Sequence, residues 1–166
     1  RGTLTTDRGT IQWRAFVPAE EDVMVFEYRP SEGERGCTWD YVAAISESPR
    51  VYRGYGGPTG KDRPQDKIPA NPPAERSTND PYSLSRQPML AGGDYTTAWR
   101  TDETGDTRRV FITIGYDTQG TSVPQAIDTL RAVAEIDCAV VERDHRRWWR
   151  DYLAQSFLSI PDSRIE

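Results

Sequence analysis

The chain has 166 residues, of which 26 are acidic and 21 are basic, so its formal net charge at pH 7 is −5. The basic residues are interspersed with acidic ones, which argues against a nucleic-acid-binding surface. No apolar run approaches the roughly 20 residues that a membrane-spanning helix needs. The length predicts one domain, or one domain with an appendage.

The N-terminal segment predicts three antiparallel strands. Residues 2–6 and 9–17 are strand-like, and residues 7–9 form a candidate hairpin turn between them. Apolar and polar residues alternate in the second segment, which predicts a half-buried strand with one apolar face. A polar connection over residues 18–22 leads to a third strand over residues 23–28. The apolar face of the second strand would consist of Ile11, Trp13, Ala15 and Val17.

Residues 37–45 predict a fourth strand, with Trp39 and Tyr41 on one of its faces. Four strands in succession, joined by short polar turns, indicate a meander within a larger β-sandwich. Residues 53–88 are rich in proline and glycine and show no apolar period, which predicts a long loop.

Two further strands are predicted over residues 93–99 and 108–116, with a turn over residues 101–106 between them. The second of these strands has aliphatic side chains at alternating positions and aromatic or small ones between them. This composition predicts burial on both faces of the strand.

Residues 122–138 predict a first helix. Ser122 and Gln125 have the spacing of a capping box, and Pro124 fits the first turn, where its missing N–H costs little. The sequence leaves open whether this helix turns near Asp137 or continues into the next one. The apolar stripe of the first helix would consist of Ile127, Leu130, Ala134 and Cys138.

The segment from residue 140 to Ile160 predicts a second helix, which ends there because the residue before Pro161 is disfavoured in helical geometry. Two neighbouring apolar stripes give this helix a face wider than a contact between two helices needs. Most of its arginines fall on the other side. The stripes consist of Val141, His145, Trp148 and Tyr152, and of Trp149, Leu153 and Phe157.

The C-terminal segment contains His145-x-x-Trp148-Trp149, then Ser156-Phe157, Ser159-Ile160-Pro161-Asp162 and Ile165-Glu166. This pattern resembles the linker that precedes the catalytic barrel in bacterial glycoside hydrolases related to families 65 and 95. Residues 14–28, RAFVPAEEDVMVFEY, resemble a pair of strands in the β-sandwich of the same enzymes. In that family a large N-terminal sandwich is followed by linker helices and by a catalytic toroid of six helix pairs.

The resemblance implies a mainly β fold: an antiparallel β-sandwich, part of a supersandwich, over residues 1–118, and C-terminal linker helices over residues 119–166. It implies that this region packs on a C-terminal (α/α) barrel of the same parent chain and helps to shape its active site. The residues expected at that interface are His145, Trp148, Trp149, Tyr152 and Phe157.

The catalytic acid of these enzymes lies in the barrel, which would follow Glu166, so we expect no catalytic residue within this chain. We also expect no cofactor and no metal site, and a secreted or periplasmic location. One histidine and two distant cysteines, Cys37 and Cys138, provide no standard zinc site, and the sequence leaves open whether the cysteines form a disulfide.

Loops of the sandwich in related enzymes reach over the barrel, which makes the proline-rich segment a candidate contact for an oligosaccharide. A disordered insertion is an equally good interpretation. The residues that would contact the sugar are Tyr55, Arg63, Arg76 and Tyr82.

Three further candidates have a structural interpretation that we favour. Asp40, between two aromatic residues, is the carboxylate best placed for acid catalysis, but a solvent-facing strand residue explains it as well. His145 is the single histidine and fits a packing role on its stripe. Trp148 and Trp149 cannot form one flat sugar platform, because successive helical residues point about 100° apart.

Two alternatives to the hydrolase interpretation remain: a stand-alone carbohydrate-binding β-sandwich, and an interaction domain unrelated to sugars. A wide apolar helix face left exposed would favour the hydrolase interpretation, so we expect Trp148 or Trp149 to be exposed or self-associated. A shallow groove lined by coplanar aromatic rings would favour the binding module.

Overall fold

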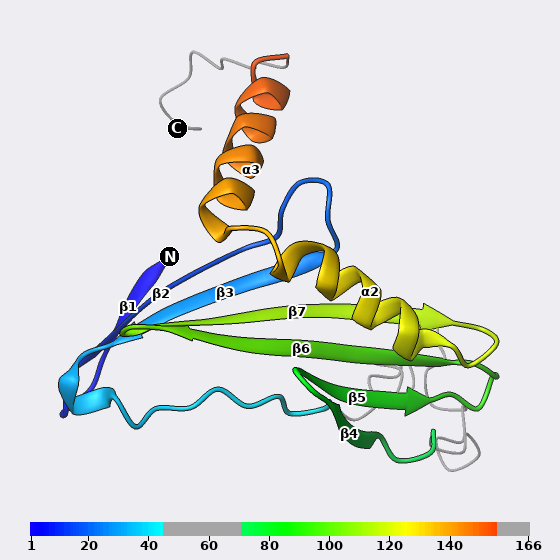
Figure 1. Cartoon of the computed structure of the whole chain (residues 1–166). Coiled ribbons are helices and arrows are strands. Elements are labelled where there is room, and N and C mark those ends of the chain that lie inside the picture. Colours follow the sequence, from blue (N-terminus) through cyan, green and yellow to red (C-terminus); the bar gives the residue numbers. More distant parts are fainter. Residues whose placement is uncertain (45–70, 156–166) are drawn as a thin grey trace, which may run out of the picture.

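The computed structural model describes residues 1–44 and 71–155, whose strands form one antiparallel sheet followed by two helices (Figure 1). The sheet has seven strands in the order β1-β2-β3-β7-β6-β5-β4. The predicted mainly β, antiparallel fold with C-terminal helices is confirmed. The elements are β1 (Gly2–Thr5), β2 (Thr10–Phe16), β3 (Val23–Pro30), the 3₁₀ turn η1 (Glu32–Glu34), β4 (Glu75–Asn79), β5 (Tyr82–Pro88), β6 (Asp94–Thr104), β7 (Thr107–Asp117), α2 (Ser122–Ala134) and α3 (Cys138–Leu153).

Helix α2 lies across one face of the sheet and forms the main core with β3, β5, β6 and β7 (Figure 1). Its closest approach is at Gly115 of β7, where an added Cβ would lie 2.5 Å from the carbonyl oxygen of Ser122. Ala126, the next small residue on the helix, also lies against this glycine. Its fully buried side chains include Val23 and Val25 of β3 and Leu130 and Val133 of α2.

The segment predicted as a fourth strand, residues 37–45, does not join the sheet ladder in its described part, residues 37–44. Its aromatic rings pack on the sheet instead: Trp39 and Tyr41 lie 5.7 and 5.2 Å from the Trp99 ring, between centroids. The side chain of Arg76 donates to the carbonyl oxygen of Tyr41, and that of Arg108 donates to the carbonyl oxygen of Cys37. Side-chain packing and arginine donors thus hold this segment, and the prediction of a ladder strand was wrong.

The predicted loop over residues 53–88 was also wrong for its described part, residues 71–88, which contains β4 and β5. Strand β5 has four buried and three partly buried residues, but only Tyr82 and Leu84 alternate as large apolar residues before polar residues follow, which is too short a run to indicate a strand. Strand β4 is exposed at the sheet edge, again without an apolar face. The predicted turn over residues 101–106 is shorter than expected, because β6 and β7 continue to Thr104 and from Thr107.

The apolar side of β2 lies on the sheet face that α2 does not cover, and it is largely exposed. The prediction that this side is buried was wrong. The ladder places Trp13 and Tyr28 on this face, and the described residues leave Trp13 38 % exposed. On β7 the same face carries Val110, which is fully buried, and Ile114, which is 65 % exposed, so the predicted burial on both faces holds only for the first half of that strand. Helix α2 covers only the other face, where Phe16 packs against the core.

The start of α2 is fixed by the sheet and not by the predicted capping box. The Ser122 hydroxyl lies 2.7 Å from the Thr96 hydroxyl, and the Gln125 side chain accepts a hydrogen bond from the backbone N–H of Tyr116. The buried Asp94 carboxylate accepts from the Ser122 backbone N–H at 3.3 Å, which satisfies a free donor at the helix N-terminus.

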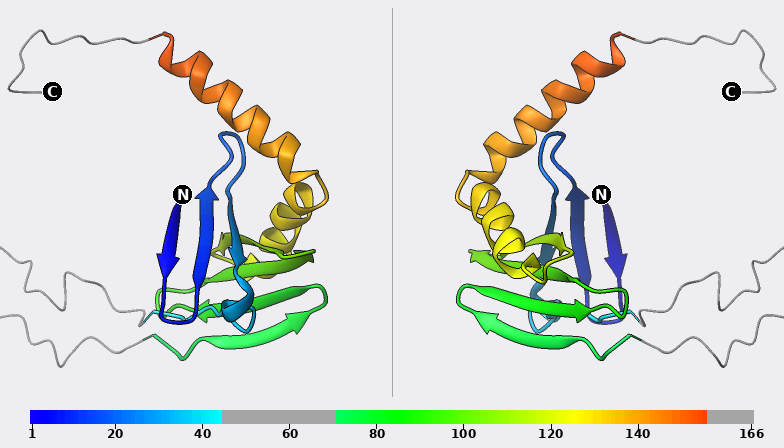
Figure 2. Two further views of the ribbon diagram at one scale, coloured as in Figure 1. Left: turned by 90° about the vertical axis from the view of Figure 1, so that its left-hand side faces the viewer. Right: turned by 90° about the vertical axis from the view of Figure 1, so that its right-hand side faces the viewer.

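The two helices are separate, which answers the question the sequence left open. Helix α2 ends at Ala134, and the Asp137 side chain caps α3 by accepting from the N–H of Ala139 at 2.9 Å. The two views of Figure 2 show α3 projecting away from the layer formed by the sheet and α2. Helix α3 is described to Leu153, short of the predicted end at residue 160.

Candidate functional site

Helix α3 is attached to the rest of the protein through its first half alone. Cys138 and Val141 are buried, whereas every described residue from Arg146 onward is exposed. The helix therefore presents its C-terminal half as a free surface, on which the candidate site is built.

An ion-pair cluster holds the first half of α3 against the sheet. Arg14 of β2 bonds both Glu27 of β3, at 3.0 Å, and Glu142 of α3. Arg109 of β7 adds a second bond to Glu27 at 2.7 Å. Burial by itself would raise the pKa of Glu27, but the hydrogen bonds from Arg109 and Arg14 outweigh it and lower that pKa. A hydrogen bond from Arg146 is the main cause of the lowered pKa of Glu142.

His145 has the packing environment that the sequence favoured. Its ring lies 5.3 Å from the Phe16 ring and 6.3 Å from the Trp149 ring, between centroids. Its Nδ1 atom is buried and has no hydrogen-bond partner among the described residues. Neither contact supplies the carboxylate or hydroxyl that a catalytic histidine would need beside it.

The exposed half of α3 carries a contiguous aromatic surface, which we call the α3 aromatic face and define as Trp148, Trp149, Tyr152 and Leu153. These side chains are 36 %, 43 %, 54 % and 60 % exposed. The rings of Trp148 and Tyr152 are stacked at an interplanar angle of 9°, whereas those of Trp148 and Trp149 stand at 80°. The two tryptophans thus form no single flat platform, as the helix geometry predicts.

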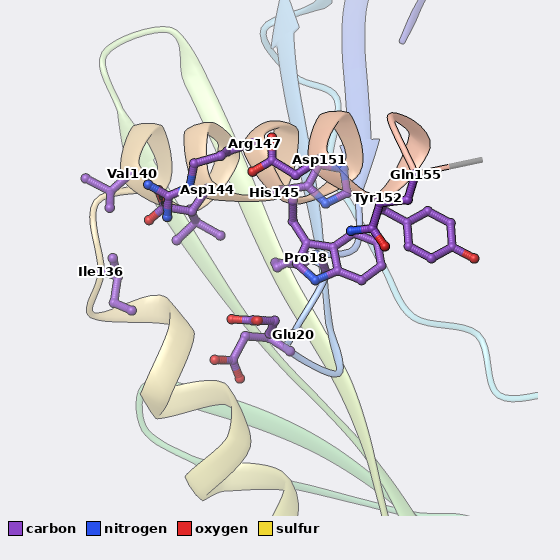
Figure 3. Close-up of a pocket in the computed structure, with 14 residues that line it drawn as sticks. Pro18, Glu20, Ile136, Val140, Asp144, His145, Arg147, Asp151, Tyr152 and Gln155 are labelled. Atoms are coloured by element: carbon purple, nitrogen blue, oxygen red, sulfur yellow. Dashed lines mark ion pairs between the residues drawn. The ribbon is translucent and has the colours of Figure 1, made fainter. Parts of the chain in front are cut away.

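A groove of about 500 Å³ lies between α3 and the connection from β2 to β3; we call it the hairpin–helix groove (Figure 3). Its sheet-side wall is formed by residues 18–21 and its helix-side wall by one flank of α3. In Figure 3 Glu20 lies on the sheet side, opposite Asp144 and Asp151 on the helix. Trp148 and Tyr152 belong both to this groove and to the α3 aromatic face.

Of the four candidate sugar-contacting residues, the structure describes Arg76 and Tyr82, and it does not bring these two together. Tyr55 and Arg63 lie outside the described residues. Tyr82 is buried in the core, and Arg76 is exposed on β4 with its guanidinium bonded to Asp40 at 3.4 Å. Arg76 is paired with Ser85 in the ladder, so its side chain and that of Tyr82 point to opposite faces of the sheet.

The remaining candidates are placed as follows. Phe157 lies outside the described residues. The two cysteines are free. Cys37 lies beside Arg108 and Cys138 is near Arg109, and these two arginines are consecutive in β7, so their side chains point to opposite faces of the sheet. Burial raises the pKa of the Cys138 thiol.

Two buried carboxylates were missed by the sequence analysis. Glu34 bonds Arg8 at 2.9 Å and accepts from Thr6, while Asp94 accepts from Arg86 and Ser122. Burial alone would raise the pKa of Asp94, but the hydrogen bonds from Ser122 and Arg86 lower it. Their partners come from other elements, so no local pattern could have identified them. Both are satisfied by neighbours and act in holding the fold.

Within residues 1–44 and 71–155 no three histidine, cysteine or acidic side chains gather in a way that could hold a metal ion. None of the described helices is long and apolar enough to cross a membrane. Comparisons of the chain with protein-family models, with curated proteins and with solved structures find no match.

Proposed function

We propose that this chain is a non-catalytic N-terminal region of a carbohydrate-active glycoside hydrolase, which packs on a helical barrel and helps to shape its active site. The observation that carries the proposal is the α3 aromatic face. Large apolar side chains exposed together mark interaction surfaces. We assign the barrel as the partner from the resemblance of residues 145–166 to a hydrolase linker, and the same resemblance suggests a secreted or periplasmic enzyme acting on an oligosaccharide.

The arrangement of α3 supports an interface role over a catalytic one. The helix is fixed at its base by ion pairs and by buried Cys138 and Val141, and it holds its aromatic side chains clear of the sheet. Rigid aromatic side chains dominate the energy of protein interfaces because each buries a large area. Among the described candidates for catalysis, Asp40 is an exposed residue that pairs with Arg76, and the buried Nδ1 atom of His145 has no hydrogen-bond partner.

A stand-alone carbohydrate-binding module is the second candidate. It is favoured by the stacked pair Trp148 and Tyr152, because a pyranose ring can stack on the outer face of such a pair. Against it, those rings face each other at a centroid distance of 5.1 Å and do not lie side by side in one plane. Calorimetric titration of the isolated chain with a panel of oligosaccharides separates the two candidates: binding that Tyr152→Ala abolishes would favour the module.

The test of the hydrolase proposal uses the intact gene product. We expect the coding sequence beyond Glu166 to contain paired amphipathic helices with a carboxylate-bearing loop, and the intact protein to cleave a glycosidic bond. In that protein Leu153→Gln should lower both activity and thermal stability, because a buried leucine contributes about 2 to 5 kcal/mol.

The matched control is Leu90→Gln. Leu90 is 53 % exposed, close to the 60 % of Leu153, but lies in the β5–β6 connection. We expect no change in the control. Equal behaviour of the two variants, or a downstream sequence without helix pairs, would count against the barrel interface.

A further inference from the structure

We infer that the hairpin–helix groove is a docking site for an arginine side chain that a partner presents next to apolar residues. The inference rests on the proposed function in one respect, that α3 is an interface, and it adds the chemistry of the group received there. It follows from the charges of the two walls and from the aromatic ring between them.

The sheet-side wall carries two carboxylates that the described structure leaves without a cation. Glu20 and Glu21 are exposed at the turn between β2 and β3, and neither makes an ion pair with another described residue. The backbone beneath them is anchored, because Pro18 is buried and the Thr113 hydroxyl donates to the carbonyl oxygen of Asp22 at 2.6 Å. The backbone that carries these two adjacent negative charges is thus held beside the groove.

The helix-side wall adds two further carboxylates but no free cation. Asp144 bonds Arg147 at 3.3 Å, and Asp151 bonds Arg150 at 3.1 Å, both as exposed pairs. Arg147 is the only arginine or lysine of the lining, beside His145 and against four acidic residues. Asp144 also bonds Arg143 at 3.3 Å, so both helix-side carboxylates are paired, and the unpaired negative charge of the groove comes from Glu20 and Glu21.

The floor of the groove is apolar. Trp148 contributes an indole ring that is 36 % exposed, and Ile136 and Val140 contribute aliphatic side chains. A planar guanidinium can stack on an indole ring and donate two parallel hydrogen bonds to a carboxylate. The ammonium group of lysine is less suited to both interactions. Aliphatic neighbours of that arginine would cover the isoleucine and the valine.

The probes are two synthetic helical peptides that differ at two positions. Both consist of alanine and leucine, and one carries arginine where the other carries glutamine, at two positions four residues apart on the leucine face. Fluorescence anisotropy of each labelled peptide, titrated with the 166-residue chain, gives the two dissociation constants. We expect the arginine peptide to bind at least about tenfold more tightly at low salt, with the difference shrinking between about 0.02 and 0.5 M NaCl.

A pair of charge variants assigns the difference to the groove. In Glu20→Gln/Glu21→Gln the preference for arginine should fall to about threefold or less, because both unpaired carboxylates are neutralised. The control Asp7→Asn/Glu32→Gln removes two exposed carboxylates beyond the other ends of β2 and β3 and should keep the preference. Unchanged thermal unfolding of both variants confirms that the fold is intact.

Three results would overturn the inference: no binding of either peptide, equal binding of the two, or an arginine preference that survives in Glu20→Gln/Glu21→Gln. The proposed function is tested separately by Leu153→Gln in the intact protein. If Leu153→Gln has no effect but the preference for the arginine peptide is found, the barrel interface is refuted and the arginine site stands. If Leu153→Gln lowers activity but no arginine preference is found, only the arginine site is refuted.

Discussion

Helices α2 and α3 follow each other in the chain and are both amphipathic, yet only α2 has its apolar side covered. Leu130 and Val133 of α2 are fully buried against the sheet, while the α3 aromatic face remains exposed in the described structure. Apolar periodicity therefore predicts a helix and its apolar face, but not where the partner of that face is located.

The difference between the helices has a cause in the sheet. Gly115 of β7 lets α2 approach to a distance that any side chain would prevent, and Asp94 of β6 receives the first backbone donor of the helix. Helix α3 has no corresponding seat among the described residues. It is held at its base by two buried residues, Cys138 and Val141, and by exposed or half-exposed ion pairs, which contribute less and depend more on the solvent.

Shortening a side chain on the buried face of α2 should cause the greatest loss of stability. Leu130→Ala should lower the free energy of unfolding by about 3 kcal/mol, because it leaves a cavity in a core that is closed on all sides. Leu153→Ala on α3 is the matched change at an exposed position and should alter it by less than about 0.5 kcal/mol. Urea unfolding of the isolated chain, followed by far-ultraviolet circular dichroism, measures both.

Comparable losses in the two leucine variants would contradict the comparison, since they would show that α3 is covered in the isolated chain. Sedimentation at several protein concentrations would then distinguish cover by self-association from cover within one molecule.

The sequence predicted those parts of the fold whose pattern is local. Strand β3 and both helices have the expected periodicity, and the turn before β2 was placed correctly. Strand β5 was missed because the sheet buries Ser85 and Gln87, so polar residues occupy positions that an alternation rule reserves for apolar ones.

The same reasoning explains what was missed at the candidate site. The exposed tryptophans of α3 follow from helical spacing, and their exposure was expected. The hairpin–helix groove could not be predicted, because it depends on how residues 18–21 meet a helix more than a hundred positions later in the chain. Burial of Asp94 likewise depends on contacts with Arg86 and Ser122 in other elements.

Removing the charge of Asp94, which accepts a hydrogen bond at the start of α2, should cause a smaller loss of stability. Asp94→Asn should lower the free energy of unfolding at pH 7 by about 2 kcal/mol, because the hydrogen bonds from Ser122 and Arg86 lose a charged acceptor. The pKa of Asp94 is lowered in the folded state, so its carboxylate stabilises the fold above the unfolded pKa of about 3.9. That contribution is lost as the pH falls through the folded pKa.

The gap between wild type and Asp94→Asn should therefore be largest near neutral pH and should narrow steadily on acidification below about pH 4. Asp128→Asn is the control, since Asp128 forms an exposed ion pair with Arg131 on the outer side of α2. It should cost less than about 0.5 kcal/mol at any pH. A gap that widens in acid would refute the assigned role of Asp94.

The smallest expected effect concerns the base of α3, where the comparison predicts local loosening without global unfolding. Glu142→Gln removes the carboxylate that joins α3 to Arg14 of β2. Because that arginine is partly exposed, we expect a loss of only about 0.5 to 1 kcal/mol, confined to α3. Hydrogen exchange of the α3 amides should accelerate about two- to fivefold, while the amides around Leu130 in α2 keep the rate set by global unfolding.

Asp151→Asn, which removes an exposed pair near the free end of α3, should leave the exchange rates of both helices unchanged. Equal acceleration in α2 and α3 would mean that the two helices open as one unit, and the ion pair at residue 142 would then support the core as much as the projecting helix.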